Sequence, residues 1–277
     1  MNWLFEPLQH AFLRQALLAS LLVGATCSLL GVHVLLRRMT FFGDAIAHTT
    51  LPGLVIAYLN RWNLFLGAVV AALLAAIGIS WLCRRRRLHE DAAIGVTLSG
   101  MFALGVVLIS RTRSFRDFSH MLFGNVLAVT SSDLLGILLV FLLVVTTLWL
   151  LHKELLVSTL DPVHSSTIGL NVERIRDALL VLLALGVVTG IQAVGVVLTT
   201  ALMITPAATA SLITRRLTPM LICSVVNSSL ACIVGLYASY YWSVSSGGAI
   251  VLSSTLLFGL VLVVDAVRRF RISARDR

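Results

Sequence analysis

"ALLVLLALGVVTGIQAVGVVLTTALMITPAATASLIT", Ala178–Thr214, is a run of 37 residues without a charge. A helix that crosses a bilayer needs about 20 apolar residues, and at a rise of ~1.5 Å per residue this run is too long for one crossing of a ~30 Å hydrocarbon core. The chain must therefore turn back or break inside it, and Gly195 to Pro206 is the expected interruption. The run predicts two passes, at 178–197 and 200–214.

The rest of the chain has the same character. Of 277 residues, 58% are hydrophobic and 12% charged, about half the roughly 25% charged residues of a soluble domain. Leu217–Val264 holds 48 uncharged residues and needs its own interruption, which we place at the aromatic and polar stretch Tyr240–Gly248. Shorter spanning runs are Ala16–Leu36, Leu64–Cys83, Ala92–Ser110 and Leu134–Leu151. We expect an all-α, polytopic transmembrane helical bundle of eight or nine spans that forms a single domain over residues 1–277.

Basic residues indicate how the chain is oriented. The net charge of +9 could suggest nucleic acid as a partner, but Lys and Arg cluster at span ends, so we expect no nucleic acid. With passes at 16–36, 45–60, 64–83, 92–110, 134–151, 178–197, 200–214, 217–240 and 249–266, sixteen of the 21 Lys and Arg fall on one side. These are Arg37, Arg38, Arg84–Arg87, Lys153, Arg174, Arg176, Arg215, Arg216 and the five arginines after Val267. The positive-inside rule makes that side cytoplasmic and predicts a multi-pass protein of the cell (inner) membrane.

One carboxylate and one imidazole stand out in "GDAIAHTTLPG", Gly43–Gly53. Asp44 and His48 are four residues apart, so on a helix they share a face with β-carbons about 5–6 Å apart. Together they suit borderline divalent metals such as Mn(II), Fe(II) and Zn(II) better than sodium or calcium. Two ligands fit a transit site, and two copies of the chain around a common axis would supply two carboxylates and two imidazoles. The alternative is that Asp44 caps a helix and His48 is an interfacial histidine.

Two other segments are candidates for a functional role. Pro52 should break or bend the helix one turn after His48, and broken helices often line the path in transporters. The polar stretch His152–Asp177 lies on the predicted cytoplasmic side and is long enough for a small helix that meets a partner. A solvated loop without a partner is the other reading of that stretch.

The sequence lacks the motifs that would let this chain bind and hydrolyse ATP by itself. Its one lysine, Lys153, is not in a G-x-x-x-x-G-K-[ST] motif, and there is no H-E-x-x-H or G-x-S-x-G. We therefore expect no enzyme and no permanently bound cofactor, only a transported divalent metal ion. A secondary carrier driven by protons or sodium is the alternative, but it needs more ionisable residues at mid-membrane. A membrane-embedded enzyme would need a second catalytic group near Asp44 and His48.

Three segments resemble signature sequences of the membrane permease subunit of ATP-binding-cassette (ABC) importers for manganese, zinc and iron. They are "LLRRMTFFGDAIAHTTLPGLVIA" (Leu35–Ala57), "LFGNVLAV" (Leu122–Val129) and "VGVVLTTALMITPAATA" (Val194–Ala210). The resemblance implies a binding-protein-dependent importer that translocates a divalent transition metal into the cytoplasm. It also implies a second permease chain, identical or not, a cytoplasmic ABC ATPase dimer, and an extracellular or periplasmic metal-binding protein.

Position by position, the resemblance assigns roles to single residues. The aspartate and histidine of the metal path correspond to Asp44 and His48. The region that couples transport to the ATPase corresponds to Leu160–Ile175, with Asp161 and Gly169, inside the cytoplasmic loop 152–177. Pro206 corresponds to a helix break near the path, as Pro52 does. The absence of a histidine-rich segment favours manganese or iron over zinc.

Overall fold

The computed structural model describes residues 9–84, 89–110 and 126–275. Arg85–Arg87, the basic residues between 111 and 116, and the first half of the segment Leu122–Val129 lie outside these ranges. The described elements are α2 (Ala11–Leu36), α3 (Phe42–Thr49), α4 (Leu51–Leu59), α5 (Leu64–Arg84), α6 (Glu90–Ser110), the 3₁₀ turn η2 (Val126–Ala128), α8 (Ser131–Leu150), α9 (His152–Leu160), α10 (Pro162–Thr167), α11 (Val172–Val194), α12 (Val196–Ile213), α13 (Leu217–Trp242) and α14 (Ser246–Arg275).

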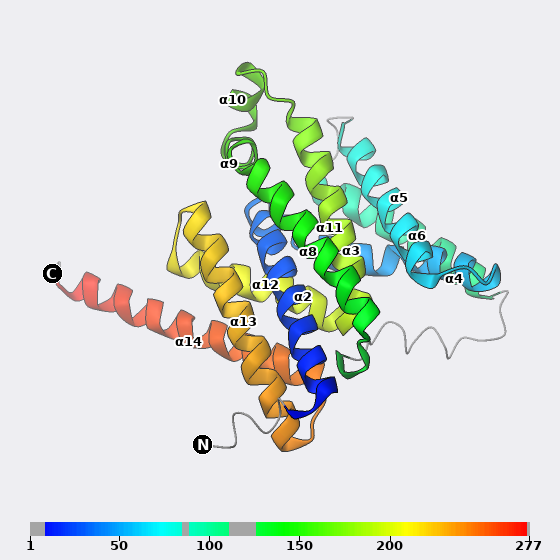
Figure 1. Ribbon diagram of the computed structural model, residues 1–277. Helices are drawn as coiled ribbons and strands as arrows, with labels where there is room; N and C mark the ends of the chain where they lie inside the picture. The colour runs from blue at the N-terminus through cyan, green and yellow to red at the C-terminus, as the bar shows by residue number, and fades with distance from the viewer. Residues whose placement is uncertain (1–8, 85–88, 111–125, 276–277) are drawn as a thin grey trace.

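The expected all-α bundle is confirmed. In the described ranges, eight helices are long and apolar enough to cross a membrane: α2, α5, α6, α8, α11, α12, α13 and α14. Along the chain, the consecutive pair α3 and α4 follows α2 and precedes α5, and α4 lies beside α5 and α6 at the edge of the bundle (Figure 1). Each of these two helices is shorter than a full span. The described ranges contain eight passes if the pair is not counted and nine if α3 and α4 together count as one.

Contacts between distant residues show which helix ends lie together. Gln15 Nε2 donates to Ser131 Oγ at 3.0 Å, so α2 and α8 begin on the same side of the bundle. At the other side, the end of α5 meets the start of α11, because Arg84 forms an ion pair with Asp177. We call this second side, which also carries Arg37, α9 and α10, the arginine-rich side (upper in Figure 1). Since α2 and α5 both end there, α3 and α4 must carry the chain back between them.

The core forms around α2 and α11, which are the most buried of the spans. Fully buried leucines of these helices, Leu30, Leu179, Leu180 and Leu183, contribute to one large apolar cluster. By contrast, α8 and α14 expose most of their apolar surface. In a membrane such a surface faces lipid or another chain.

Gly195 is the point at which the 37-residue run turns back. It ends α11 and precedes α12, with φ 91° and ψ 166°. These angles are essentially restricted to glycine, because a Cβ would clash with the backbone. The expected interruption is therefore correct at Gly195 but wrong at Pro206, which lies inside α12 and does not end that helix. A proline near the middle of a span is tolerated when neighbouring helices support it, and Pro206 is buried against such neighbours.

We expect Gly195→Ala to lower the stability of the purified protein by roughly 1–3 kcal/mol, because alanine is strained at this φ and ψ. Thermal unfolding in detergent measures the effect. Gly136→Ala is the matched control, because Gly136 lies within α8 and no atom lies within 4 Å of its added methyl group. The two variants should differ clearly in melting temperature, and equal melting temperatures would contradict the assigned role of Gly195.

Candidate metal path

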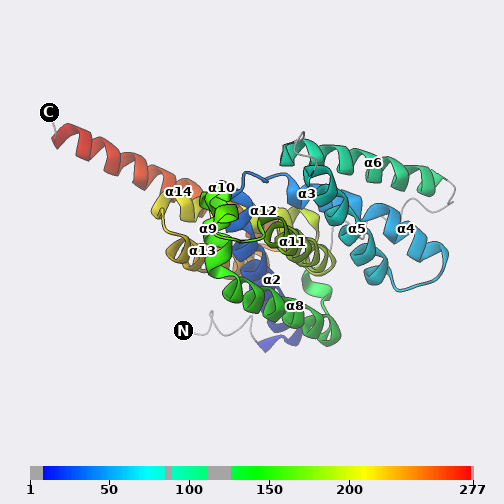
Figure 2. The ribbon, with the colours of Figure 1, turned by 90° about the horizontal axis from the view of Figure 1, so that it is seen from above.

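Asp44 and His48 share one exposed face of α3. The other side of this short helix is buried, with Phe42, Ala45 and Ile46 fully inside the protein. Seen along the bundle, α3 lies between α6 and α12 (Figure 2). The predicted common face is therefore present, and it lies on the surface of the single chain.

The surroundings of the pair are aromatic and apolar. The His48 ring contacts the Phe102 ring of α6 edge to face, with ring centroids 5.6 Å apart. Phe41, directly before α3, is 70% exposed. Asp44 makes no hydrogen bond or ion pair with any residue of the described ranges. A carboxylate is thus held on a short helix without a partner in the described part of its own chain.

The helix-cap reading of Asp44 is wrong. The N-cap position of α3 is Phe41, and no side chain caps the helix. Asp44 lies in the first turn, where a negative charge is favoured by the helix dipole, but that interaction leaves its oxygens available.

Pro52 lies in the first turn of α4, just after the break between α3 and α4 at Thr50. Proline has no N–H to donate to the carbonyl of His48, four residues earlier. The series of helical backbone hydrogen bonds is therefore interrupted beside the histidine. The hydroxyl of Thr50 donates to the Ala47 carbonyl at 2.6 Å and that of Thr49 to the Ile46 carbonyl at 3.0 Å. The break is thus stabilised by side chains and lies directly after the candidate ligands.

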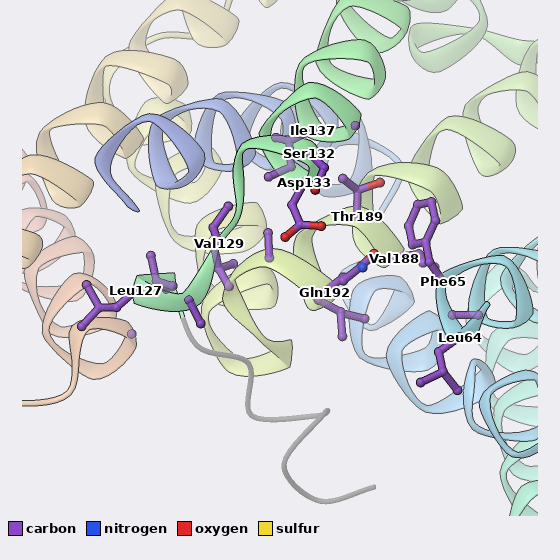
Figure 3. Close-up of a pocket in the computed structure, with 18 of the residues that line it drawn as sticks. Leu64, Phe65, Leu127, Val129, Ser132, Asp133, Ile137, Val188, Thr189 and Gln192 are labelled. Carbon is purple, nitrogen blue, oxygen red and sulfur yellow. The ribbon is translucent and has the colours of Figure 1, made fainter. Parts of the chain in front are cut away.

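A cavity of about 1020 Å³ opens on the side opposite to the arginine-rich side. It lies among the starts of α5 and α8, the end of α11 and the loop before α14. Figure 3 shows that Asp133 of α8 lies close to Thr189 and Gln192 of α11 along this cavity. Asp133 is the one charged side chain among the described lining residues, and it also forms a capping box with Thr130.

The cavity does not include the predicted ligands. Thr50, two residues after His48, lines it, whereas Asp44 and His48 are exposed on α3 and are not among its lining residues. Neither Asp133 nor the cavity was predicted from the sequence as a site. The signal was weak, because the polar residues that line it come from ends of spans far apart in the chain.

The described part of one chain does not supply a complete metal site. In the described ranges, no three His, Cys, Asp or Glu side chains gather closely enough to hold an ion. The cysteines Cys27, Cys83 and Cys232 are buried and Cys223 is half-buried. Asp44 and His48 therefore remain a set of two ligands on one surface.

The predicted cytoplasmic loop 152–177 forms two short helices, α9 and α10, at the arginine-rich side, and the predicted coupling region Leu160–Ile175 begins at the last residue of α9. We call α9, α10 and the residues up to the start of α11 the coupling segment. Asp161 ends α9, and its carbonyl accepts hydrogen bonds from the backbone N–H and the hydroxyl of Ser165. Gly169 follows α10 with φ 84°, and open space surrounds the position of a Cβ. Three apolar side chains on this segment are exposed, Leu160, Val163 and Ile168, and we call them the apolar coupling surface.

Comparisons with known proteins agree with this architecture. Residues 9–265 match the model of the ABC 3 transport family. The chain is 42% identical over 251 residues to the manganese transport system membrane protein MntC of Listeria monocytogenes, covering 91% of this chain and 90% of that protein. It is 34% identical over 272 residues to the chelated iron transport system membrane protein YfeD of Yersinia pestis, covering 97% of this chain and 92% of that protein.

A solved structure has the same fold. PsaBC from Streptococcus pneumoniae, in complex with a Fab, aligns with a TM-score of 0.81 and 36% sequence identity, covering 93% of this chain and 94% of that one. The helix order, the apolar spans and these alignments over nearly the whole length lead to one assignment: the chain belongs to the ABC 3 transport family and is the permease component of an ABC transporter.

Proposed function

We propose that this permease carries a divalent transition metal, manganese or iron before zinc, into the cytoplasm across the cell (inner) membrane. The observation that carries this proposal is the Asp44–His48 pair on the exposed face of α3, where no residue of the described ranges pairs with the Asp44 carboxylate. Manganese and iron are also the metals in the names of the Listeria and Yersinia relatives.

The pair needs a second permease chain. A charged side chain that faces hydrocarbon costs about 2.5–3.5 kcal/mol or more, so such groups normally face a protein interior or a water-filled path. Asp44 has no partner in the described part of its own chain. A second chain, identical or related, that packs against α3 and brings its own pair would cover both carboxylates and form a site of two Asp and two His.

That ligand set suits transit. Carboxylate oxygen and imidazole nitrogen together match Mn(II), Fe(II) and Zn(II), while sodium and calcium prefer oxygen alone. An ion held by two chains is released when the two surfaces separate. The proposed ligands lie on the short helix α3, which ends at the break at Thr50. A small movement of α3 would therefore change the distance between the ligands of the two chains.

ATP hydrolysis belongs to separate subunits in this proposal, because the sequence contains no phosphate-binding loop. The apolar coupling surface supports a docking role for α9 and α10. Val163 is 75% exposed and Leu160 is 76% exposed at the end of the protein that carries most of the described arginines. Such a surface suits a cytoplasmic ATPase dimer, with Asp161 and Gly169 setting the shape of the segment. A metal-binding protein would deliver the ion on the opposite side, where the cavity opens.

The transit site predicts that Asp44→Asn nearly abolishes metal uptake, because the amide keeps the shape of the side chain but loses the charge that offsets dehydration of the ion. Loss of an outer-shell partner already lowers metal affinity roughly 10–100-fold, and loss of a ligand should have at least that effect. His48→Ala should lower uptake and shift selectivity toward ions that prefer oxygen. Uptake of manganese by cells at matched membrane abundance measures both effects.

Asp91→Asn is the matched control for that experiment. Asp91 is an exposed acid in the first turn of α6, at the arginine-rich side, and the change removes the same charge. The control should transport almost normally. Near-normal uptake by Asp44→Asn would remove the pair from the metal path, even if the protein proved to be a metal permease.

The coupling segment generates a second prediction. Gly169→Leu, strained at φ 84°, or Asp161→Lys should weaken ATPase association or uncouple ATP hydrolysis from uptake, while the spans stay folded. Co-purification of the ATPase, ATP hydrolysis and metal uptake in liposomes are the readouts. Ser166→Ala, an exposed change within α10, serves as the control. Normal association together with normal uptake in both variants would exclude this segment from coupling.

A further inference from the structure

The arginine-rich side contains a partly buried cluster of charges between the helix ends. Arg37 follows α2, Glu90 begins α6 and Arg176 lies in the second turn of α11. The Glu90 carboxylate interacts electrostatically with both guanidinium groups. Arg84 of α5 and Asp177 form an ion pair beside them. Four helices of the bundle thus meet through charged side chains on this side.

Arg37 connects this cluster to the coupling segment. Its Nη2 donates a hydrogen bond to the Ser158 hydroxyl of α9 at 3.0 Å. Ser158 is buried, and its hydroxyl also donates to the Leu155 carbonyl at 3.2 Å, so the hydroxyl is held in a fixed direction. Burial lowers the pKa of Arg37 while the charge of Glu90 raises it, and the guanidinium remains charged. The buried Nε of Arg37 has no hydrogen-bond acceptor in the described ranges. The hydrogen bond to Ser158 therefore fixes the position of the guanidinium group.

From Arg37 the chain reaches the candidate metal ligands through a tight turn. The N–H of Met39 donates to the Val34 carbonyl at 2.9 Å, and the N–H of Phe42 donates to the Met39 carbonyl at 2.9 Å. Both Met39 and Phe42 are almost completely buried. The turn is therefore packed and hydrogen-bonded, unlike a flexible linker.

The start of α3 is also fixed against another span. A Cβ at Gly43 would lie 2.3 Å from the Met203 Cε of α12, so the helix begins in direct contact with that side chain. Asp44 is the next residue. A displacement of Arg37 must consequently move α3 and its ligands, because neither the turn nor the helix start has free space to absorb it.

We propose that Arg37 is a positioning residue that transmits movement of α9 to the helix that carries Asp44 and His48. This inference rests on the proposed function, because it assumes that the ATPase acts on α9 and α10. Arg37 does not contact the ion. It holds the end of α2, and through the buried turn the start of α3, in register with the coupling segment.

The test uses the complete importer, permease with its ATPase and metal-binding protein, reconstituted in liposomes. Arg37→Gln should lower the metal transported per ATP hydrolysed about ten-fold, the effect of losing one hydrogen bond to a charged group. ATPase association and manganese binding by the detergent-solubilised complex should persist. Ser158→Ala should have the same effect, and the double variant should be no worse than either single variant, because both changes remove one shared interaction.

Two further variants make the outcome specific. Arg38→Gln is the matched control, because Arg38 is the exposed neighbour of Arg37, and its transport per ATP should equal that of the wild type. Arg37→Lys should transport more metal per ATP hydrolysed than Arg37→Gln, because a lysine ammonium can also donate a hydrogen bond to Ser158. If Arg37→Gln does not fold, Arg37→Lys and Ser158→Ala still decide the question.

The positioning role would be overturned if Arg37→Gln or Ser158→Ala transported as much metal per ATP hydrolysed as the wild type. It would also be overturned if the losses of the two single variants added up in the double variant. A different result tests the proposed function itself. If the wild-type complex takes up no divalent metal when ATP is supplied, the metal-import proposal fails, and that failure is recognised before any variant is compared.

Discussion

The fixed position of one carboxylate, that of Asp44, is the constraint on which the proposed function depends. Asp44 is held on the exposed face of a short helix whose other face is locked in the core, and no residue in the described part of the chain pairs with it. Rotation of α3 to bury the carboxylate would expose Phe42 and Ile46, which are fully buried. In the proposed function, a second permease subunit and the ion that passes between the two chains compensate this charge.

The remaining architecture can be understood as support for that helix. The buried spans α2 and α11 form a rigid centre, and α12 returns beside them because Gly195 permits a sharp reversal. The first residues of α3 then pack against Met203 of α12. At the arginine-rich side, Arg37 joins the end of α2 to α9. The proposed metal ligands and the proposed coupling segment are thus connected through a few short, packed elements, and in the proposed function movement passes between them over a short path.

Much of this arrangement could be predicted from the sequence, because apolar length and the distribution of arginine are direct consequences of the bilayer. The spans, the reversal at Gly195 and the common face of Asp44 and His48 all follow from local spacing. The continuation of α12 through Pro206 was not predicted, because neighbouring helices decide whether a proline ends a helix. The hydrogen bond from Arg37 to Ser158 joins residues 121 positions apart, and the cavity beside Asp133 is lined by several distant span ends. Contacts of this kind depend on tertiary packing and leave no periodic pattern in the sequence.

The proposed function requires that two chains complete one metal site through Asp44 and His48. Equilibrium titration of the purified permease dimer with manganese, followed by electron paramagnetic resonance of the bound Mn(II), counts the ions bound. We expect one tightly bound ion for two chains, with nitrogen coupling from imidazole, and loss of that ion in the Asp44→Asn variant. One ion for each chain, or binding that Asp44→Asn leaves unchanged, would contradict it.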